Sequence, residues 1–114
     1  MTVLSELSKV LEARKSASAD DSYVASLYAA GLNKILEKIG EEATEAIIAA
    51  KDLDAAGGRD PAAQEAFIKE VADLWFHSMV ALAHLNLGPD DVLNVLSERF
   101  GIGGLVEKAS RSSE

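Results

Sequence analysis

Hydrophobic residues recur along most of the chain three and four positions apart, the spacing that gathers side chains on one face of an α-helix. The pattern begins at residue 3 and returns, after short interruptions, until residue 100. Apolar and polar residues do not alternate anywhere as they do in a half-buried β-strand. The sequence therefore predicts an all-α protein.

Turn-forming residues divide the hydrophobic pattern into five predicted helices. Ser22 and Asp60 are suitable N-caps, and Pro61 stands at a favoured first helical position. Gly31 suits the left-handed turn that ends a helix. The expected architecture is a small antiparallel bundle of four to five helices. The predicted helices cover residues 3–15, 23–30, 32–55, 61–87 and 91–100.

The composition agrees with a helical fold and limits its size. Many Ala, Leu, Glu and Lys residues, together with only 2 prolines and 5% aromatic residues, favour helix over sheet. A chain of 114 residues has the length of one domain. We expect a single domain over residues 1–114, with the polar end at 112–114 frayed.

Charge, cysteine content and the N-terminal sequence exclude several classes of function. The net charge of −8 argues against a nucleic-acid partner, because binding to a polyphosphate depends on Lys and Arg. The absence of cysteine excludes disulfides, thiolate metal sites and cysteine nucleophiles. No signal-peptide pattern and no long apolar run occurs, so we expect a soluble cytoplasmic protein with no membrane partner.

Acidic residues form a stripe along the helix predicted at 32–55. Glu41, Glu42 and Glu45 lie opposite its apolar face, within the segment KIGEEATEAIIAAK. Like charges four positions apart, as at Glu37, Glu41 and Glu45, destabilise a helix by roughly a few tenths of a kcal/mol per pair. A solvated charged face is one interpretation of the stripe. The repulsion between these glutamates favours a second interpretation, in which a bound cation offsets the repulsion.

Apolar residues cover almost the whole circumference of the helix predicted at 61–87, which is typical of a buried helix. Trp75 is interpreted as part of the core. His77 is either a core residue, the interpretation we favour, or a neighbour of a polar site. The polar sector spans about 60° of the helical wheel. It contains Glu70, Asp73, His77 and His84.

The two long helices together carry a pattern of convergent acids, E-E-x-x-E, a spacer of 24 residues, then E-x-x-D. Their short connection makes them antiparallel neighbours, so Glu42 and Glu45 are expected to face Glu70 and Asp73. Four carboxylates without cysteine form a hard oxygen site suited to Mg²⁺ or Mn²⁺. A di-iron site is excluded, because it needs Glu-x-x-His motifs that this chain lacks.

A metal site of this kind indicates chemistry on phosphates. The ion would bridge phosphate oxygens and neutralise a leaving pyrophosphate, while a carboxylate such as Glu41 or Glu45 takes a proton from the attacking water. Lys34 and Lys38 precede the acids by one to two turns and are placed to meet substrate phosphates. Pairing with neighbouring glutamates on the surface is an equally good interpretation of both lysines.

EEATE followed by EVADLW resembles the signature of the MazG-type all-α nucleotide pyrophosphohydrolases. SYVASLYAAGLNKILEKIGEEATEAIIAAK at 22–51, EVADLWFH at 70–77 and GLVEKASR at 104–111 are similar to segments of the phosphoribosyl-ATP pyrophosphohydrolase family of histidine biosynthesis. The resemblance implies Mg²⁺-dependent hydrolysis of N1-(5-phosphoribosyl)-ATP to phosphoribosyl-AMP and pyrophosphate. It also implies a homodimer or higher homo-oligomer that completes a MazG-like bundle.

The same resemblance implies roles for individual residues. Glu42, Glu45, Glu70 and Asp73 match the metal-binding acids, and Glu41 matches the acid beside them. The family also has characteristic positions suited to holding phosphate or ribose. In this chain they are occupied by Tyr23, Lys34, Lys38, Lys51, Lys108 and Arg111.

The C-terminal segment departs from the family pattern, because Gly103 stands where the family usually has serine. Residues 105–111 are expected to be ordered, against another subunit. Two other functions stay open at this point. One is a house-cleaning nucleoside triphosphate pyrophosphohydrolase of the same fold, and the other is a non-enzymatic helical interaction module that docks through its acidic stripe.

Overall fold

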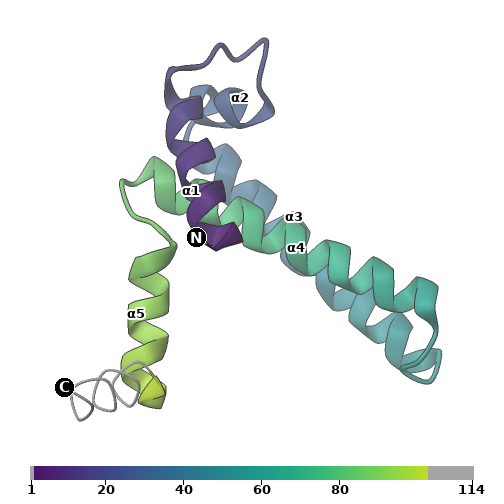
Figure 1. Cartoon of the computed structure of the whole chain (residues 1–114). Helices are drawn as coiled ribbons and strands as arrows, with labels where there is room; N and C mark the ends of the chain where they lie inside the picture. Colours follow the sequence, from purple (N-terminus) through teal and green to yellow (C-terminus); the bar gives the residue numbers. More distant parts are fainter. Residues whose placement is uncertain (1, 103–114) are drawn as a thin grey trace.

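The protein is described by a computed structural model over residues 2–102, and every α-helix in that range is predicted by the sequence. Two long helices form an antiparallel hairpin, and shorter helices gather near its open end (Figure 1). The prediction of an all-α protein of four to five helices is confirmed. In chain order the elements are α1 (Val3–Ala13), the 3₁₀ turn η1 (Arg14–Ser16), α2 (Tyr23–Ala30), α3 (Leu32–Ala55), α4 (Pro61–His84) and α5 (Pro89–Phe100).

Both N-caps predicted from the sequence are present. The Ser22 hydroxyl accepts a hydrogen bond from the backbone N–H of Ala25 at 3.2 Å, and the Asp60 carboxylate accepts one from Ala63 at 2.9 Å. Each cap satisfies an N–H that has no partner inside the first turn of its helix. The caps explain why α2 and α4 begin at the predicted residues.

The helix α4 ends at His84, before the predicted end at Leu87. Asn86 has a φ of 63°, a left-handed conformation that Asn adopts more readily than other side chains. The N–H of Leu87 reaches the carbonyl of Leu82 at 2.8 Å, and the N–H of Asn86 reaches that of Ala83 at 3.0 Å. This is a Schellman-type ending, which turns the chain away from the helix axis.

Two other helix ends differ from the prediction by two residues. The first helix ends at Ala13 and continues as the tighter turn η1 to Ser16. The helix α5 begins at Pro89 instead of residue 91, because Gly88 acts as N-cap and its N–H donates to the Asp91 carboxylate at 2.9 Å. The Pro-Asp-Asp segment therefore forms the first turn of α5, where acidic side chains are favourable.

The hydrophobic core lies where α1 and α2 pack against the open end of the α3–α4 hairpin (Figure 1). Tyr28 joins this region through its hydroxyl, which donates to the carbonyl of Leu11 at 2.9 Å. The core therefore anchors one end of the hairpin and leaves the other end extending outward. Its buried apolar residues are Leu11, Val24, Leu27, Ile35, Met79, Val80 and Ala83.

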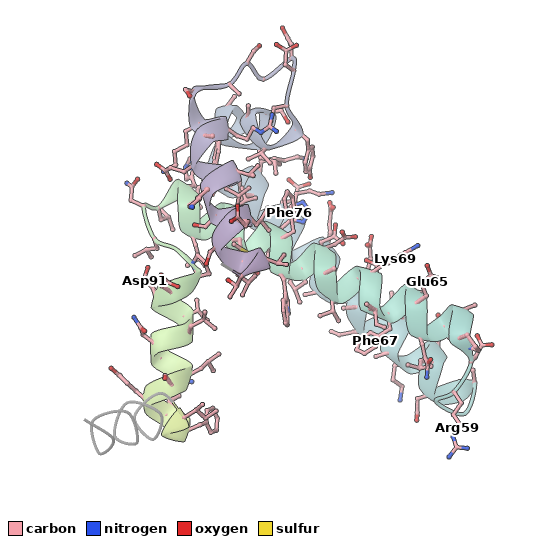
Figure 2. All side chains as sticks on the ribbon, viewed as in Figure 1. Arg59, Glu65, Phe67, Lys69, Phe76 and Asp91 are labelled. Atoms are coloured by element: carbon pink, nitrogen blue, oxygen red, sulfur yellow. The ribbon has the colours of Figure 1, made fainter. Side chains whose placement is uncertain are left out.

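The single chain has an open shape. The helix α5 projects away from the hairpin (Figure 1), and the radius of gyration is 17.5 Å. A compact chain of this length has a radius of gyration of about 13 Å. Figure 2 shows Arg59 at the far tip of the hairpin and Phe67 along its outer half, whereas Phe76 lies near the crossing with α1. Within residues 2–102, the outer part of the hairpin thus packs mainly α3 against α4.

The expectation that Trp75 belongs to the core of a helix buried on all sides is wrong for the single chain. Trp75 is 61% exposed, and several other large apolar side chains are also exposed. Helical periodicity identifies apolar positions but does not tell which chain covers them. The exposed apolar residues on the three longest helices include Ile47, Ile48, Ile68, Val92, Leu93, Leu96 and Phe100.

None of the helices within residues 2–102 combines the length and the hydrophobicity that crossing a membrane requires.

Candidate metal centre and active site

Three carboxylates converge in the middle of the α3–α4 hairpin. Glu42, Glu45 and Glu70 each place a carboxylate oxygen within 4.8 Å of the others. Glu42 and Glu45 lie one turn apart on α3, and Glu70 comes from the antiparallel α4 beside it (Figure 1). The short turn after Ala55 sets the register of the hairpin, so the two acidic segments meet at the same height.

The Glu42 side chain is the most deeply buried of the three acids, at 7% exposure. Burial is the main reason that its pKa is raised, and the negative charges of Glu45 and Asp73 raise it further. A buried carboxylate near other carboxylates favours its protonated form, unless a cation compensates the charge. A cation that binds here would displace the proton and compensate the charge of the ionised carboxylate.

Glu70 responds even more strongly to its neighbours. A hydrogen bond with the Glu45 carboxyl, loss of hydration and the charge of Glu42 together raise the pKa of Glu70 to about 7. One oxygen of Glu70 and one of Glu42, the Oε2 atom in each case, is buried and finds no hydrogen-bond partner among residues 2–102. Buried carboxylate oxygens of this kind require a proton or a metal ion.

Asp73 does not belong to the group of three converging carboxylates and has an exposed side chain. Its charge nevertheless contributes to the raised pKa of Glu42, so it lies at the edge of the same site. The residues present fit a hard divalent cation, since they offer carboxylate oxygens, two of them unpartnered, and no sulfur.

The predicted base Glu41 lies on the outer side of α3. Lys38 Nζ donates to Glu41 Oε2 at 2.9 Å, and this hydrogen bond holds the pKa of Glu41 below its usual range. The same contact raises the pKa of Lys38. Lys34 pairs with Glu37 at 3.5 Å. Both lysines thus make the surface pairs that the sequence suggested as their alternative role.

Tyr23 and His77 form a polar contact that the sequence did not indicate. The Tyr23 hydroxyl lies 2.8 Å from His77 Nε2, and His77 Nδ1 lies 2.8 Å from the carbonyl oxygen of Asp73. His77 is 5% exposed, so burial was predicted correctly. Its polar partners could not be predicted, because 54 residues separate it from Tyr23 and no periodicity relates α2 to α4.

The remaining candidates lie further from the acids or beyond the described residues. Lys51 is exposed on α3, nearer the tip of the hairpin than Glu45. Lys108, Arg111, the ordering expected for residues 105–111 and the fraying expected for 112–114 all lie outside the range that the structure describes.

A helical hairpin that brings carboxylates together around buried, unpartnered oxygens is the arrangement of an all-α nucleotide pyrophosphohydrolase. The model of the phosphoribosyl-ATP pyrophosphohydrolase family matches residues 4–100 of the chain. A relative from Methylococcus capsulatus, named phosphoribosyl-ATP pyrophosphatase, is 56% identical over 111 residues, which cover 97% of each chain. The chain belongs to the phosphoribosyl-ATP pyrophosphohydrolase family, and it is a hydrolase of histidine biosynthesis.

Proposed function

We propose that the chain hydrolyses N1-(5-phosphoribosyl)-ATP to phosphoribosyl-AMP and pyrophosphate in a Mg²⁺-dependent reaction, the second step of histidine biosynthesis. Family membership over residues 4–100 supports the substrate. The observation that supports the metal is the group of Glu42, Glu45 and Glu70, with two buried carboxylate oxygens that accept no hydrogen bond from the described part of the chain. The proposed enzyme is a single cytoplasmic domain.

Glu42, Glu45, Glu70 and Asp73 are the proposed ligands of Mg²⁺, with Mn²⁺ as a substitute. When bound, the cation would supply charge neutralisation for the phosphate oxygens and for the leaving pyrophosphate. The three converging carboxylates repel one another in its absence, as the raised pKa values of Glu42 and Glu70 indicate. The protein therefore holds its ligands in place before the cation arrives, at a cost that binding offsets.

Two carboxylates are candidates for the proton transfer from the attacking water. Glu41 is exposed and ionised beside Lys38, which makes it a weak base that can nevertheless orient a water molecule. Glu45 belongs to the group of three converging carboxylates, so it would lie closer to a bound cation than Glu41 does. The proposed contacts to phosphate and ribose come from Tyr23, Lys34, Lys38, Lys51, Lys108 and Arg111.

The proposed active form is a homodimer or higher homo-oligomer. Support comes from the open shape of the chain, whose radius of gyration of 17.5 Å exceeds that of a compact domain, and from the exposed Trp75. An apolar groove between α1, α4 and α5 is also left open by residues 2–102, and its lining includes Leu4, Met79 and Leu93. A second copy would cover these apolar surfaces, in the way that obligate interfaces resemble a domain core.

The reaction is tested by incubating the purified protein with Mg²⁺ and measuring pyrophosphate release from phosphoribosyl-ATP and from a panel of ordinary nucleoside triphosphates. Release from phosphoribosyl-ATP alone supports the proposal. Release from the ordinary triphosphates indicates the house-cleaning activity instead. No release from any substrate, with correctly folded protein, indicates the helical interaction module.

A further inference from the structure

His77 holds a defined tautomer because of what surrounds it. Its Nδ1 lies 2.8 Å from the carbonyl oxygen of Asp73, and a carbonyl oxygen only accepts hydrogen bonds. The proton of a neutral ring is therefore on Nδ1. The second nitrogen, Nε2, then has no proton and can only accept.

The tautomer of His77 determines which way the Tyr23 hydroxyl points. The two groups lie 2.8 Å apart, so the Tyr23 O–H donates to Nε2 of the neutral ring. A phenol oxygen has one proton, and in Tyr23 that proton is already donated to His77 Nε2. What Tyr23 offers to solvent is therefore a lone pair, an acceptor.

Tyr23 is in position to present that lone pair to a ligand. The tyrosine is 53% exposed, whereas His77 behind it is buried. The ring of Tyr23 stacks on Phe76 at 6.4 Å and meets the edge of His77, so the aromatic group is fixed on two sides. Asp73, which holds His77, is also a proposed ligand at the edge of the metal site, one helical turn or about 6 Å away along α4.

We propose that His77 is a positioning residue that fixes Tyr23 as a hydrogen-bond acceptor for a sugar hydroxyl of the nucleotide substrate. Phosphate oxygens are acceptors themselves and cannot bond to an acceptor, whereas ribose hydroxyls carry protons. In the proposed substrate, the ribose that carries the α-phosphate is the sugar next to the phosphoanhydride, so an anhydride held at the acids would bring this ribose nearest to Tyr23. This inference rests on the proposed function, and it gives Tyr23 a role in sugar recognition instead of phosphate binding.

A purely structural role for His77 makes a different prediction. A histidine that only completes the core would pair with a buried group, and removing its partner would affect stability alone. In this protein the partner is the oxygen of a half-exposed tyrosine beside the site. The chain has 2 tyrosines and 2 histidines, so Tyr28 and His84 provide matched controls that stack on each other elsewhere in the fold.

The tautomer is tested directly by long-range ¹H–¹⁵N correlation spectroscopy of the imidazole rings at alkaline pH, where imidazole is neutral. His84→Gln identifies which signals belong to His77. A proton on Nδ1 with an unprotonated Nε2 supports the proposal, and a proton on Nε2 overturns it. This measurement needs no substrate, so its outcome does not depend on whether the proposed reaction is correct.

Recognition of the sugar is tested by kinetics with phosphoribosyl-ATP and an analogue built on 2′,3′-dideoxyadenosine. Loss of one hydrogen bond corresponds to a loss of about tenfold in kcat/KM. We expect Tyr23→Phe and His77→Phe each to lose about this much, mainly through a raised KM, because the sugar is held equally before and during the reaction. Tyr28→Phe and His84→Phe are expected to keep the wild-type KM.

Two comparisons decide whether His77 acts through Tyr23. The double variant is expected to lose no more than either single variant, because both remove the same contact. The dideoxy analogue is expected to be poor with the wild type and no worse with Tyr23→Phe. Multiplicative losses in the double variant, or a lowered kcat at unchanged KM in Tyr23→Phe, overturn the proposal.

Two further outcomes are distinguished from failure of the sugar-recognition role: misfolding of a variant and absence of the proposed reaction. If His77→Phe loses its helical circular-dichroism signal, the tautomer and the dideoxy comparison with Tyr23→Phe decide the question. If the wild type releases no pyrophosphate from phosphoribosyl-ATP, the proposed function fails, and the sugar-recognition role fails with it even where the tautomer is as expected.

Discussion

The carboxyl groups of Glu45 and Glu70 converge across the α3–α4 hairpin with oxygens within 4.8 Å of each other, and the Glu45 carboxyl is the largest of the influences that raise the pKa of Glu70 to about 7. Two carboxylates this close together favour sharing a proton or binding a cation. The raised pKa of Glu70 favours the proton when no cation is bound. The proposed enzyme would use the cation, and the exchange of one for the other has measurable consequences for stability, metal binding and activity.

The first consequence is a pH dependence of folding in the absence of metal. The pKa of Glu70 is raised from 4.5 to about 7 in the folded state, so the folded chain keeps a proton that the unfolded chain releases. The stability from this group is fully present below pH 4.5 and is lost as pH rises through about 7. Chemical denaturation in the presence of a chelator, repeated across this range, measures the loss.

Glu70→Gln is the variant that isolates this effect, because it keeps the shape of the side chain and removes its titration. We expect the variant to lack this part of the pH dependence and to be more stable than the wild type above pH 7 without metal. Glu65→Gln is the control, since Glu65 is an exposed residue of the same helix that pairs with Lys69 at 3.1 Å. If the free energy of unfolding of Glu70→Gln changes with pH in parallel with that of the wild type, Glu70 is not the source of the pH dependence.

The second consequence is that Mg²⁺ stabilises the wild type more at high pH than at low pH. The cation competes with the shared proton for the same oxygens, so its affinity rises as Glu42 and Glu70 ionise. At a Mg²⁺ concentration about one hundred times the dissociation constant, the free energy of unfolding increases by about 2.7 kcal/mol. Thermal denaturation with and without Mg²⁺ at two pH values measures the difference. If Mg²⁺ stabilises Glu45→Gln as much as it stabilises the wild type, Glu45 is not a ligand of the cation.

The helices and the acidic site could be predicted from the sequence because both depend on interactions between residues that are close in sequence. Ser22 and Asp60 determine where α2 and α4 begin, and a short turn after Ala55 forces α3 and α4 to run antiparallel with Glu45 opposite Glu70. Each of these features depends on residues close in sequence or on the register of one helical hairpin.

Other features could not be predicted, because they depend on which surfaces meet. The pairing of Tyr23 with His77 joins α2 to α4 across 54 residues, and a lone histidine in an apolar helix carries no sign of its partner. Trp75 was placed in the core because apolar periodicity does not distinguish burial in the same chain from burial against another. The end of α4 differs from the prediction for a local reason, because Leu85 and Leu87 extend the apolar pattern while the left-handed Asn86 ends the helix in a Schellman-type motif.

The third consequence concerns activity. Glu45→Gln keeps the size of the side chain but removes a charge from the proposed metal site, so we expect it to abolish Mg²⁺-dependent pyrophosphate release. Altering even the groups that support metal ligands costs roughly 10- to 100-fold, so the loss expected for a ligand is at least about hundredfold. The far-ultraviolet circular-dichroism spectrum should be unchanged, and Glu65→Gln should retain wild-type activity. Near-normal turnover in Glu45→Gln excludes it as a ligand and as a base.

The last prediction concerns the surface around Trp75, which is the only tryptophan in the chain and is 61% exposed in the single subunit. If a second copy covers it, as proposed, the wild type is an oligomer and its tryptophan emission shifts to longer wavelength on dilution as the subunits separate. Trp75→Glu places a charge in that interface, where burying an unpaired charge is costly, and is expected to give a monomer. Light scattering coupled to size-exclusion chromatography measures the mass, and Trp75→Phe, which keeps an aromatic ring, is expected to remain oligomeric. A wild type that stays monomeric at high concentration, or a Trp75→Glu variant with the wild-type mass, shows that this surface is not the interface between subunits.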